Sequence, residues 1–454
     1  MKVLLVNPFQ VKLVARKGRI YNRTWTPLDL AYTAAVLRQD GHEVKILDAN
    51  AERLGPDEVA PHGRGMDKVF ITSTSLDRWQ CPHLDIEPFL ATVAALRAAN
   101  PELYVLGSHG TVKPEEMLAT TQARAIVRGE PEITVRDVCR GLPLAEIRGV
   151  TFPEGGAVRS TPDQKGVKMD ELPLPALDLL PMHLYQYEVI GDRFTLFEMS
   201  RGCASTCTFC LLKTYGPGVR RKSTERVIAE LEDAYRNHGV RTAYFIDLEF
   251  TILRKQVIEL CQWLVAQKLD FTWCCQTRFD LVDEELLTWM KRAGCTLIHF
   301  GVEAGSDRML ELVDKGITMA KIREGMRLVK RVGIQTATFF MMGFPESTEQ
   351  DMKDIVAFAR ELRPDYPLFH IAAPYPGTRM YEQVKHDPKL RFSDQSLFPE
   401  AVEGRFTVQE LKAMTRKAYL SYYASPVAIA RRLLRGDFKQ MFRQAKLFLN
   451  FVRS

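Results

Sequence analysis

Residues 198–210 read Glu-Met-Ser-Arg-Gly-Cys-Ala-Ser-Thr-Cys-Thr-Phe-Cys, which places three cysteines in a C-x3-C-x2-C spacing. Thiolates this close in sequence can surround one metal centre. Structural zinc usually takes four ligands, often as two spaced pairs, and the nearest further candidates, His238 and Cys261, are remote in sequence. Three thiolates suit a cubane iron–sulfur cluster whose fourth iron stays open for a substrate. The alternative is a trio of buried thiols, and the polar residues between the cysteines argue against it. The three candidate metal ligands are Cys203, Cys207 and Cys210.

Downstream of the cysteines, residues 223–378 alternate between helical and extended patterns. Helices are predicted at 224–238, 254–268, 283–293, 319–332 and 349–362, and strands at 243–247, 271–276, 296–303, 335–343 and 369–372. Such units are typical of a partial (β/α)6 barrel, in which polar residues at the C-terminal ends of the strands form the site. The candidates there are Asp247, Glu249, Gln276, Arg278 and Glu303. Each of these could instead be part of a surface salt bridge or a helix cap.

Upstream, residues 1–150 show the alternation of strands and helices that predicts an α/β domain with a doubly wound parallel sheet. Strands are predicted at 2–6, 43–48, 68–72, 103–107 and 125–127, and helices at 28–39 and 84–98. Ligands of such sheets bind beyond the carboxyl ends of the strands. The candidates at these ends are Asn7, Ser73, Thr74, Ser75, Gly107, Ser108, His109, Gly129 and Glu130. The alternative is that these residues merely form tight turns.

Four regions follow from these patterns. Residues 151–195 are rich in proline and glycine and predict a linker between the two α/β domains. We therefore expect a sheet domain at 1–150, the linker at 151–195, a barrel at 196–385 and a C-terminal helical, basic region at 386–454.

Composition and charge limit the class of protein. Hydrophobic residues make up 46% and charged residues 26%, which is ordinary for a globular chain. No window approaches 18 consecutive apolar residues, so we expect no transmembrane helix. The N-terminal apolar run is too short for a signal peptide. Nine cysteines without such a signal favour a reducing, cytoplasmic location. Residues 405–454 carry 11 Lys and Arg against two acids, while the rest of the chain is slightly acidic. Because the basic charge is not on the main domains, we expect no nucleic-acid partner.

The C-terminal stretch 427–453 has an apolar stripe at a period of 3.6 residues, with basic residues on another face. A basic amphipathic helix with aromatic residues resembles an interfacial membrane helix, so peripheral contact with the inner membrane face is one expectation. Docking of the same helix on the barrel is the other.

The cysteine motif, with Phe209 before its last cysteine, resembles the signature of the radical S-adenosylmethionine (SAM) family. The stretches Gly301–Ser306, Met342–Glu346 and Pro374–Thr378 resemble further segments of that family. The resemblance implies that the three cysteines hold a 4Fe-4S cluster and that bound SAM is cleaved to a 5′-deoxyadenosyl radical. It also implies an electron donor such as flavodoxin or ferredoxin. The SAM-binding residues that it implies are Phe209, Asp247, Glu249, Gln276, Arg278, Glu303 (ribose hydroxyls) and Gly343 (beside adenine).

A doubly wound domain ahead of such a barrel resembles the cobalamin-binding group of that family. Pro27-Leu28-Asp29-Leu30, Gly41-His42-Glu43-Val44, Gly107-Ser108-His109 and Gly129-Glu130 carry this resemblance. It implies cobalamin at the strand ends named above. The loop after the first strand, residues 8–13, has no histidine, so a protein ligand to cobalt is not carried over. A degenerate domain that only packs on the barrel is the alternative.

The group implies a cobalamin-dependent methyltransferase that acts on an unactivated carbon of a small molecule, a lipid or a pigment-type metabolite. An alternative with the same cofactors is cyclisation, ring contraction or oxidation without methyl transfer. A non-enzymatic carrier of the corrinoid or the cluster fits poorly with the SAM-binding stretches. The tRNA methylthiotransferases need three further cysteines in the N-terminal domain, and residues 1–200 hold only Cys81 and Cys139.

Overall fold

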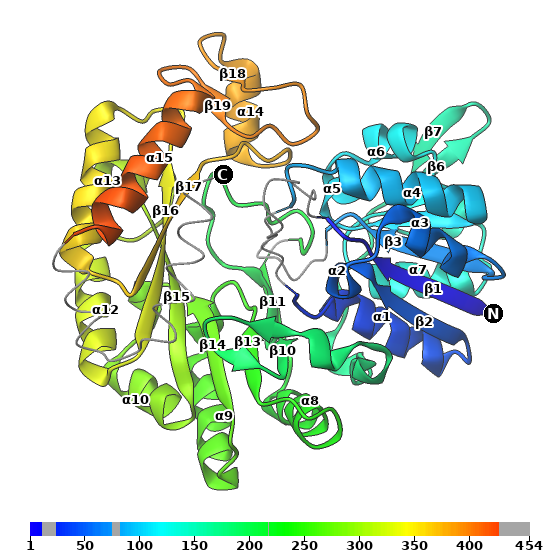
Figure 1. Ribbon diagram of the computed structural model, residues 1–454, viewed down its shortest axis with the longest axis horizontal. Helices are drawn as coiled ribbons and strands as arrows, with labels where there is room; N and C mark the ends of the chain where they lie inside the picture. The colour runs from blue at the N-terminus through cyan, green and yellow to red at the C-terminus, as the bar shows by residue number, and fades with distance from the viewer. Residues whose placement is uncertain (11–23, 75–81, 217, 426–454) are drawn as a thin grey trace. The chain divides into compact units, whose positions relative to one another are not determined.

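The computed structural model describes residues 1–10, 24–74, 82–216 and 218–425 (Figure 1). Ser75 and the segment 427–453, for which sequence patterns made specific predictions, lie outside these residues. The chain divides into two compact units. Unit 1 comprises Met1–Ala204, Cys210–Gln276 and Arg292–Cys295, and unit 2 comprises Ser205–Phe209, Thr277–Lys291 and Thr296–Ser454.

The N-terminal part of unit 1 is built on one seven-stranded sheet in the order β2-β1-β3-β4-β5-β6-β7. Its first five strands are parallel, as predicted for a doubly wound fold. The elements are β1 (Lys2–Asn7), α1 (Leu28–Gln39), β2 (Glu43–Asp48), α2 (Ala49–Glu52), α3 (Pro56–Val59), β3 (Lys68–Thr72), α4 (Glu87–Ala99), β4 (Leu103–Leu106), α5 (Ser108–Val112), α6 (Pro114–Thr121), β5 (Ala125–Val127), α7 (Pro131–Cys139), β6 (Val150–Glu154) and β7 (Ala157–Ser160).

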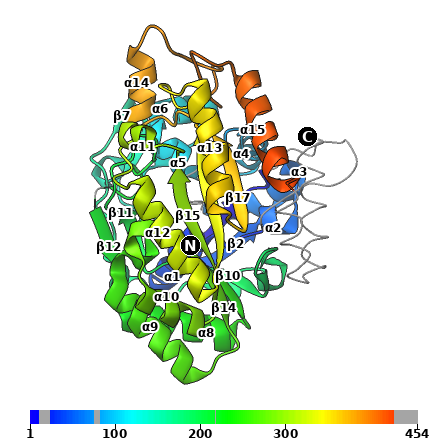
Figure 2. The ribbon, with the colours of Figure 1, turned by 90° about the vertical axis from the view of Figure 1, so that its left-hand side faces the viewer.

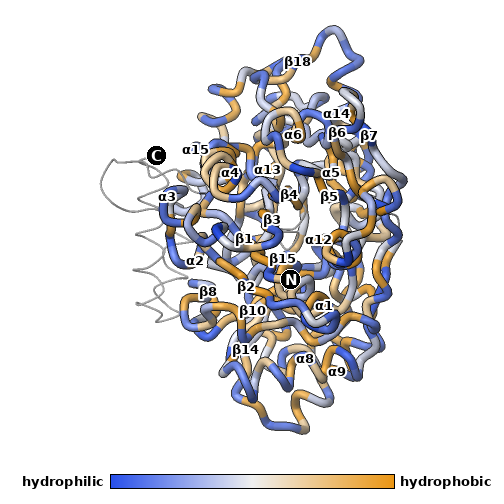
Figure 3. Tube along the Cα trace, turned by 90° about the vertical axis from the view of Figure 1, so that its right-hand side faces the viewer, coloured by the Kyte–Doolittle hydropathy of each residue, from blue (hydrophilic) through white to orange (hydrophobic). Residues whose placement is uncertain are grey.

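Helices cover this sheet through apolar stripes. In α4, Phe89, Val93 and Leu96 are buried at helical spacing, because apolar side chains three and four residues apart share one face of a helix. Figure 3 shows hydrophilic and hydrophobic residues on the same helices, as expected where one side meets the sheet. Helix α1 packs against α7, and α4 packs against α3 and α6. The predicted α/β class and doubly wound sheet are confirmed.

The segment expected to be a linker contributes two strands to this sheet. Strand β6 pairs antiparallel with β5, and β7 pairs antiparallel with β6. Gly155 and Gly156, which suggested a boundary, both have positive φ and form the turn of the β6–β7 hairpin. Glycine therefore marks a tight turn here, and the chain departs from the sheet only after β7.

The remainder of unit 1 begins the series of strand–helix repeats. Strands β10, β13 and β14 are parallel neighbours, and β11 pairs antiparallel with β12. The elements are β8 (Gln186–Tyr187), β9 (Gly191–Asp192), β10 (Phe194–Phe197), β11 (Ser200–Cys203), β12 (Gly218–Arg221), α8 (Thr224–Asn237), β13 (Thr242–Phe245), α9 (Arg254–Gln267) and β14 (Thr272–Thr277).

Unit 2 continues the repeats with parallel neighbours β15, β16 and β17. Helices α12 and α13 lie along one side of these strands, and α15 packs on α13 and β17 (Figures 1 and 2). The elements are α10 (Glu284–Arg292), β15 (Cys295–Glu303), α11 (Asp307–Leu312), α12 (Met319–Val332), β16 (Gln335–Met342), α13 (Glu349–Leu362), β17 (Tyr366–Ile371), α14 (Arg379–His386), β18 (Arg391–Phe392), β19 (Val402–Glu403) and α15 (Val408–Tyr423).

Capping residues explain why several helices begin where they do. The hydroxyls of Ser223, Thr318 and Thr348 each accept a backbone N–H in the first turn of α8, α12 and α13. Such caps satisfy N–H groups that have no partner inside the helix. Gly333 ends α12 in the left-handed conformation, where glycine is favoured.

The described part of the C-terminal region contains the helix α15, as predicted. Before α15, residues 387–407 form irregular segments and the short β18–β19 ladder. None of the helices within the described residues is long and apolar enough to cross a membrane.

Gly107, at the end of β4, provides a test of this packing. It has φ +98°, and an added Cβ would lie 2.8 Å from both Ser73 Oγ and the Thr74 carbonyl oxygen. Gly41 also has positive φ (+78°) but has nothing within 4 Å of an added Cβ. We expect Gly41→Ala to lower the free energy of unfolding by about 1–2 kcal/mol. Gly107→Ala should lower it by about 1–3 kcal/mol more, since crowding adds to strain. Urea unfolding measures both, and equal losses would contradict the close packing at Gly107.

Candidate functional site

The cysteine segment begins at the end of the first strand of a β-hairpin, and Cys207 and Cys210 lie between its two strands. Cys203 is the last residue of β11 and lies opposite Gly218 of β12. Gly202 has φ +96°, and a Cβ there would lie 2.1 Å from the Gly218 carbonyl oxygen. Only glycine therefore allows the hairpin to close just before Cys203.

Exposure separates the motif cysteines from the other described cysteines. Cys203, Cys207 and Cys210 are half-buried, whereas Cys139, Cys261, Cys274, Cys275 and Cys295 are buried. Burial raises the pKa of the Cys139 thiol to about 12, and such thiols behave as small hydrophobic groups. As the described side chains stand, no three or more His, Cys, Asp or Glu are gathered in a metal-binding arrangement. The accessible thiols of the motif have the chemistry that an iron–sulfur cluster requires.

Unit 1 contains three predicted SAM residues. Two of them, Asp247 and Glu249, accept hydrogen bonds from residues in and beside β11. Asp247 accepts hydrogen bonds from Met199 N (3.0 Å) and Ser200 Oγ (2.5 Å). Burial raises the pKa of Asp247 to about 6. Glu249 Oε2 accepts a hydrogen bond from Ala204 N (3.3 Å), directly after Cys203. The third, Gln276, lies in β14 and is half-buried.

Arg278 of unit 2 contacts the cysteine segment at Ser205. Its guanidinium donates to Ser205 Oγ (2.8 Å), to the carbonyl oxygens of Lys315 (2.7 Å) and Gly316 (3.0 Å), and to the carboxylate of Asp280. All N–H groups of the Arg278 guanidinium therefore have an acceptor. The side chain links Ser205 of the motif to residues 315–316, which follow α11.

The same segment, residues 313–316, makes two further contacts with the motif. Thr206 Oγ1 donates to Asp314 (2.8 Å), and Thr208 N donates to the Val313 carbonyl oxygen (3.0 Å). Arg379 also donates to Asp314. Sequence reasoning missed these residues. The signal in the sequence was a polar Asp-Lys-Gly turn after a short helix, a pattern that is common in loops.

Glu303 has a neighbour that the sequence did not suggest. Its Oε1 accepts a hydrogen bond from Lys315 Nζ (2.9 Å), and both side chains are buried. Burial alone would lower the pKa of Lys315, but the Glu303 carboxylate outweighs this effect and raises it, so the side chain is an ammonium. Glu303 has φ +68°, a rare conformation for a residue other than glycine. A Cβ on Gly301 would lie 2.2 Å from Glu303 Oε1, so the glycine makes room for the carboxylate.

The two remaining predicted SAM residues, Phe209 and Gly343, are linked by Phe344, which follows Gly343 and contacts Phe209. The Phe209 ring lies 5.3 Å from the Phe344 ring, next to Gly343. Gly343 has φ +82°, and an added Cβ would lie 2.6 Å from Leu411 of α15.

The carboxyl ends of β3 and β4 bring several predicted cobalamin residues together. His109 Nε2 lies 2.7 Å from the His83 carbonyl oxygen, and Nδ1 lies 3.0 Å from Ser73 Oγ. Burial lowers the pKa of His109 to about 4, so the neutral ring donates through Nε2 and accepts at Nδ1. Thr74 Oγ1 accepts from His83 N (3.2 Å). Ser108 is buried at the start of α5 beside Gly107.

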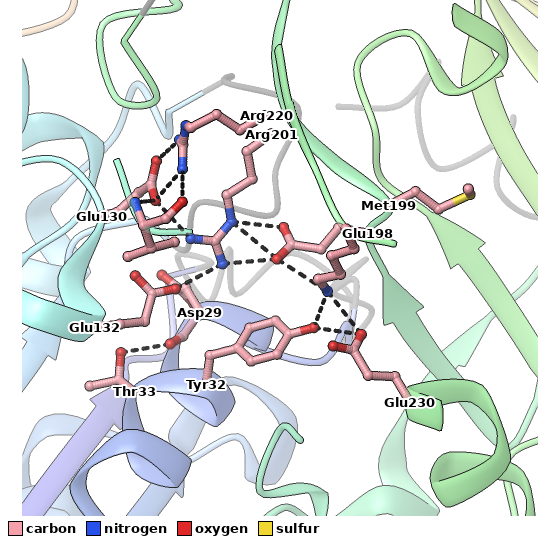
Figure 4. A network of polar contacts seen from close by, with 12 residues as sticks. Asp29, Tyr32, Thr33, Glu130, Glu132, Glu198, Met199, Arg201, Arg220 and Glu230 are labelled. Atoms are coloured by element: carbon pink, nitrogen blue, oxygen red, sulfur yellow. Dashed lines mark hydrogen bonds and ion pairs between the residues drawn. The ribbon is translucent and has the colours of Figure 1, made fainter. Parts of the chain in front are cut away.

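Asn7, Gly129 and Glu130, which are also predicted to bind cobalamin, contact other residues. Asn7 Nδ2 donates to Asp48 (2.8 Å), which also accepts from the Tyr185 hydroxyl (2.7 Å). Gly129 N donates to Thr111 Oγ1 (2.9 Å). Glu130 forms ion pairs with Arg201 and Arg220 (Figure 4).

Comparisons with known proteins identify the family of this chain. Residues 197–359 match the family model described as the radical SAM superfamily. The chain is 32% identical over 95% of its length to the uncharacterized methyltransferase PH0819 of Pyrococcus horikoshii, of which 94% is covered. It is 26% identical, over 92% of its length and 79% of the relative's, to the anaerobic magnesium-protoporphyrin IX monomethyl ester cyclase of Rubrivivax gelatinosus.

Among solved structures, the radical SAM methyltransferase TsrM from Kitasatospora setae has a TM-score of 0.68 at 18% identity. The match covers 86% of this chain and 77% of TsrM. The cobalamin-dependent radical SAM enzyme OxsB has a TM-score of 0.66 at 21% identity, with 84% of this chain and 54% of OxsB covered. These likenesses establish the fold, and the 32% identical relative spans nearly the whole chain. The chain is therefore a radical SAM enzyme, and it belongs to the family that includes the methyltransferase PH0819.

Proposed function

We propose that the chain is a cobalamin-dependent radical SAM methyltransferase acting on an unactivated carbon of a small molecule, a lipid or a pigment-type metabolite. The observation that carries the proposal is the half-buried thiol set Cys203, Cys207 and Cys210, which follows a doubly wound sheet domain in the same chain. The name of the relative PH0819 and the cobalamin bound in the TsrM and OxsB structures support it.

Under this proposal, the three cysteines hold a 4Fe-4S cluster, and SAM lies against Phe209, Asp247, Glu249, Gln276, Arg278, Glu303 and Gly343. Cobalamin lies at Asn7, Ser73, Thr74, Ser75, Gly107, Ser108, His109, Gly129 and Glu130. The bound cofactors supply an electron, a radical source and a methyl carrier. Electrons come from a small donor such as flavodoxin or ferredoxin.

The chain's own groups position and bind. Arg278 and Asp314 restrain the cysteine segment through Ser205 and Thr206. Glu303 presents a buried carboxylate, which can accept hydrogen bonds from paired hydroxyl groups. Gly107 has no side chain, which lets Ser73 and Thr74 pack closely against the end of its strand.

The cyclase relative from Rubrivivax gelatinosus favours one alternative, a reaction with the same cofactors and no methyl transfer. The products separate the two. Methyl transfer gives S-adenosylhomocysteine together with 5′-deoxyadenosine, whereas the alternative gives 5′-deoxyadenosine alone. Anaerobic reconstitution with cobalamin and a metabolite extract from a deletion strain, followed by mass spectrometry, tests the proposal.

Loss of one cluster ligand is the first test of the site. We expect Cys207→Ala to lose the iron–sulfur absorbance and SAM cleavage, because the three thiolates are the cluster's only protein ligands in this proposal. Cys139→Ala, which removes a buried thiol, is the matched control and should keep both. A Cys207→Ala protein with a full four-iron cluster and SAM cleavage would contradict the assignment.

Glu303 is tested by its effect on SAM affinity. Glu303→Gln should weaken SAM binding by about 1.5–3 kcal/mol, the range for hydrogen bonds to charged groups. The cluster content should stay unchanged. Glu311→Gln, at an exposed position of α11, is the control. If Glu303→Gln lowers the unfolding temperature while SAM affinity is unchanged, Glu303 serves only as the partner of Lys315.

We also propose peripheral membrane contact through residues 427–453. The proposal rests on their sequence, in which basic and apolar residues fall on different faces of a helical pattern. The protein should then float with anionic vesicles at low salt, with each Lys or Arg contributing about 1 kcal/mol. Arg435→Glu with Arg443→Glu should release it while SAM cleavage survives. Absence of vesicle binding at low salt would rule the contact out and favour docking of this segment on the protein.

A further inference from the structure

A buried ionic cluster in unit 1 lies around the β11–β12 hairpin. We call it the Arg201 cluster (Figure 4). Its cations come from the hairpin and the residue after it, and its other members come from the N-terminal sheet domain, from α8 and from the residue before Met199. Its members are Tyr32, Glu130, Glu132, Glu198, Arg201, Arg220, Lys222 and Glu230.

Arg201 is shared by three carboxylates. Its guanidinium lies 3.0 Å from Glu130 Oε2, 2.8 Å from Glu132 Oε1 and 2.8 Å from Glu198 Oε1. The side chains of all four residues are at most 4% exposed. Water therefore does not screen these charges, and the position of each group is fixed by the others.

The second half of the cluster joins the first through Glu198. Lys222 Nζ lies 3.7 Å from Glu198 Oε1 and donates to Glu230 Oε2 at 2.8 Å. Burial, and then the neighbouring carboxylates, raise the pKa of Tyr32 well above its usual range. Its hydroxyl thus keeps its proton and donates to Glu230 (2.8 Å).

The register of the hairpin creates an electrostatic problem. Arg201 and Arg220 are directly opposite each other across β11 and β12. Like charges at opposed positions destabilise a strand pair, and here one of the two is buried. Glu130 solves the problem, because its Oε2 accepts hydrogen bonds from Arg201 Nη1 (3.0 Å) and Arg220 Nη1 (3.1 Å).

Glu130 comes from the N-terminal sheet domain. It directly follows Gly129 after β5, at the carboxyl edge of the N-terminal sheet, and it precedes α7. Cys203 lies on the same strand as Arg201, two residues further along, which is about 7 Å. The Glu130 carboxylate of the sheet domain thus bridges the two strands of the hairpin. The first of these strands ends at Cys203, the first motif cysteine.

Stability alone does not require this arrangement. Apolar side chains of similar volume often replace a buried ion pair without loss of stability, and ionic pairs are best attested as devices that fix one geometry. A guanidinium that contacts several carboxylates restrains their relative positions more than a single ammonium would.

We infer that Glu130 is a positioning residue: by bridging Arg201 and Arg220 it keeps the β11–β12 hairpin closed and so sets the place of Cys203 from the N-terminal domain. The part of the inference that concerns Cys203 as a cluster ligand rests on the proposed function. Closure of the hairpin does not.

The test compares Glu130→Gln with Glu154→Gln in the full chain without cofactors. Glu154 pairs with Arg159 across the exposed β6–β7 hairpin and is the matched control. By hydrogen–deuterium exchange, Glu130→Gln should make the backbone amides of residues 199–203 and 218–222 exchange about tenfold faster. Glu154→Gln should leave these amides unchanged. Equal exchange in the wild type and Glu130→Gln would overturn the inference.

A rescue variant separates positioning from direct contact with a cofactor. Arg220→Gln removes the repulsion that Glu130 neutralises, so the double variant Glu130→Gln/Arg220→Gln should recover slow hairpin exchange. If Glu130→Gln alone does not fold, the double variant should still fold. A double variant that exchanges as fast as Glu130→Gln, or that fails to fold, would overturn the inference.

Anaerobic reconstitution extends the test to the cluster. Glu130→Gln should bind less iron per chain than the wild type, and the double variant should recover it. If the wild type itself binds no cluster, the proposed function fails, and the exchange data alone decide on hairpin closure. If the wild type and Glu130→Gln bind equal iron while their hairpin exchange differs, the link to Cys203 is wrong.

Discussion

Two arginines that face each other across a short hairpin are the constraint on which the cysteine segment depends. Arg201 and Arg220 repel, and Arg201 is deeply buried, so a carboxylate that lies between them favours the pairing of β11 with β12. Glu130 supplies it from the N-terminal sheet domain. The doubly wound sheet and the start of the strand–helix repeats are thereby joined through charge as well as through packing.

The rest of the motif is restrained by different means. Asp247 and Glu249 hold the backbone before and after Cys203. Within unit 2, Arg278 and the segment 313–316 hold residues 205–208. Each of these contacts is a hydrogen bond to backbone or to a short hydroxyl side chain. They fix the path of the chain and leave the half-buried thiols available.

Most of the fold could be predicted from periodicity, because strands and helices here bury regular apolar faces. The boundaries of α1, α12 and α13 match the predicted ranges. The β6–β7 hairpin could not be predicted, because its glycines and proline are equally typical of a linker. Among the candidate site residues, the spacing of Cys203, Cys207 and Cys210 indicates a shared metal centre. The ion pair of Glu303 with Lys315 and the contacts of Glu130 could not be predicted, because they join residues 12 to 90 positions apart and nothing in the local pattern indicates a charge partner.

The contrast between accessible and buried sulfur has a consequence for the chemistry of the protein in air. A thiol reacts with oxidants or alkylating reagents as its thiolate, and burial raises the pKa of Cys139, Cys261, Cys274 and Cys275 far above neutrality. Among the described cysteines, damage should therefore begin at the motif, as sulfenic acid or as a disulfide between its members, both of which thiol reductants reverse. The buried cysteines would stay unmodified. A chain that has lost its iron–sulfur cluster to oxygen should therefore remain folded, and the cluster can be rebuilt in it.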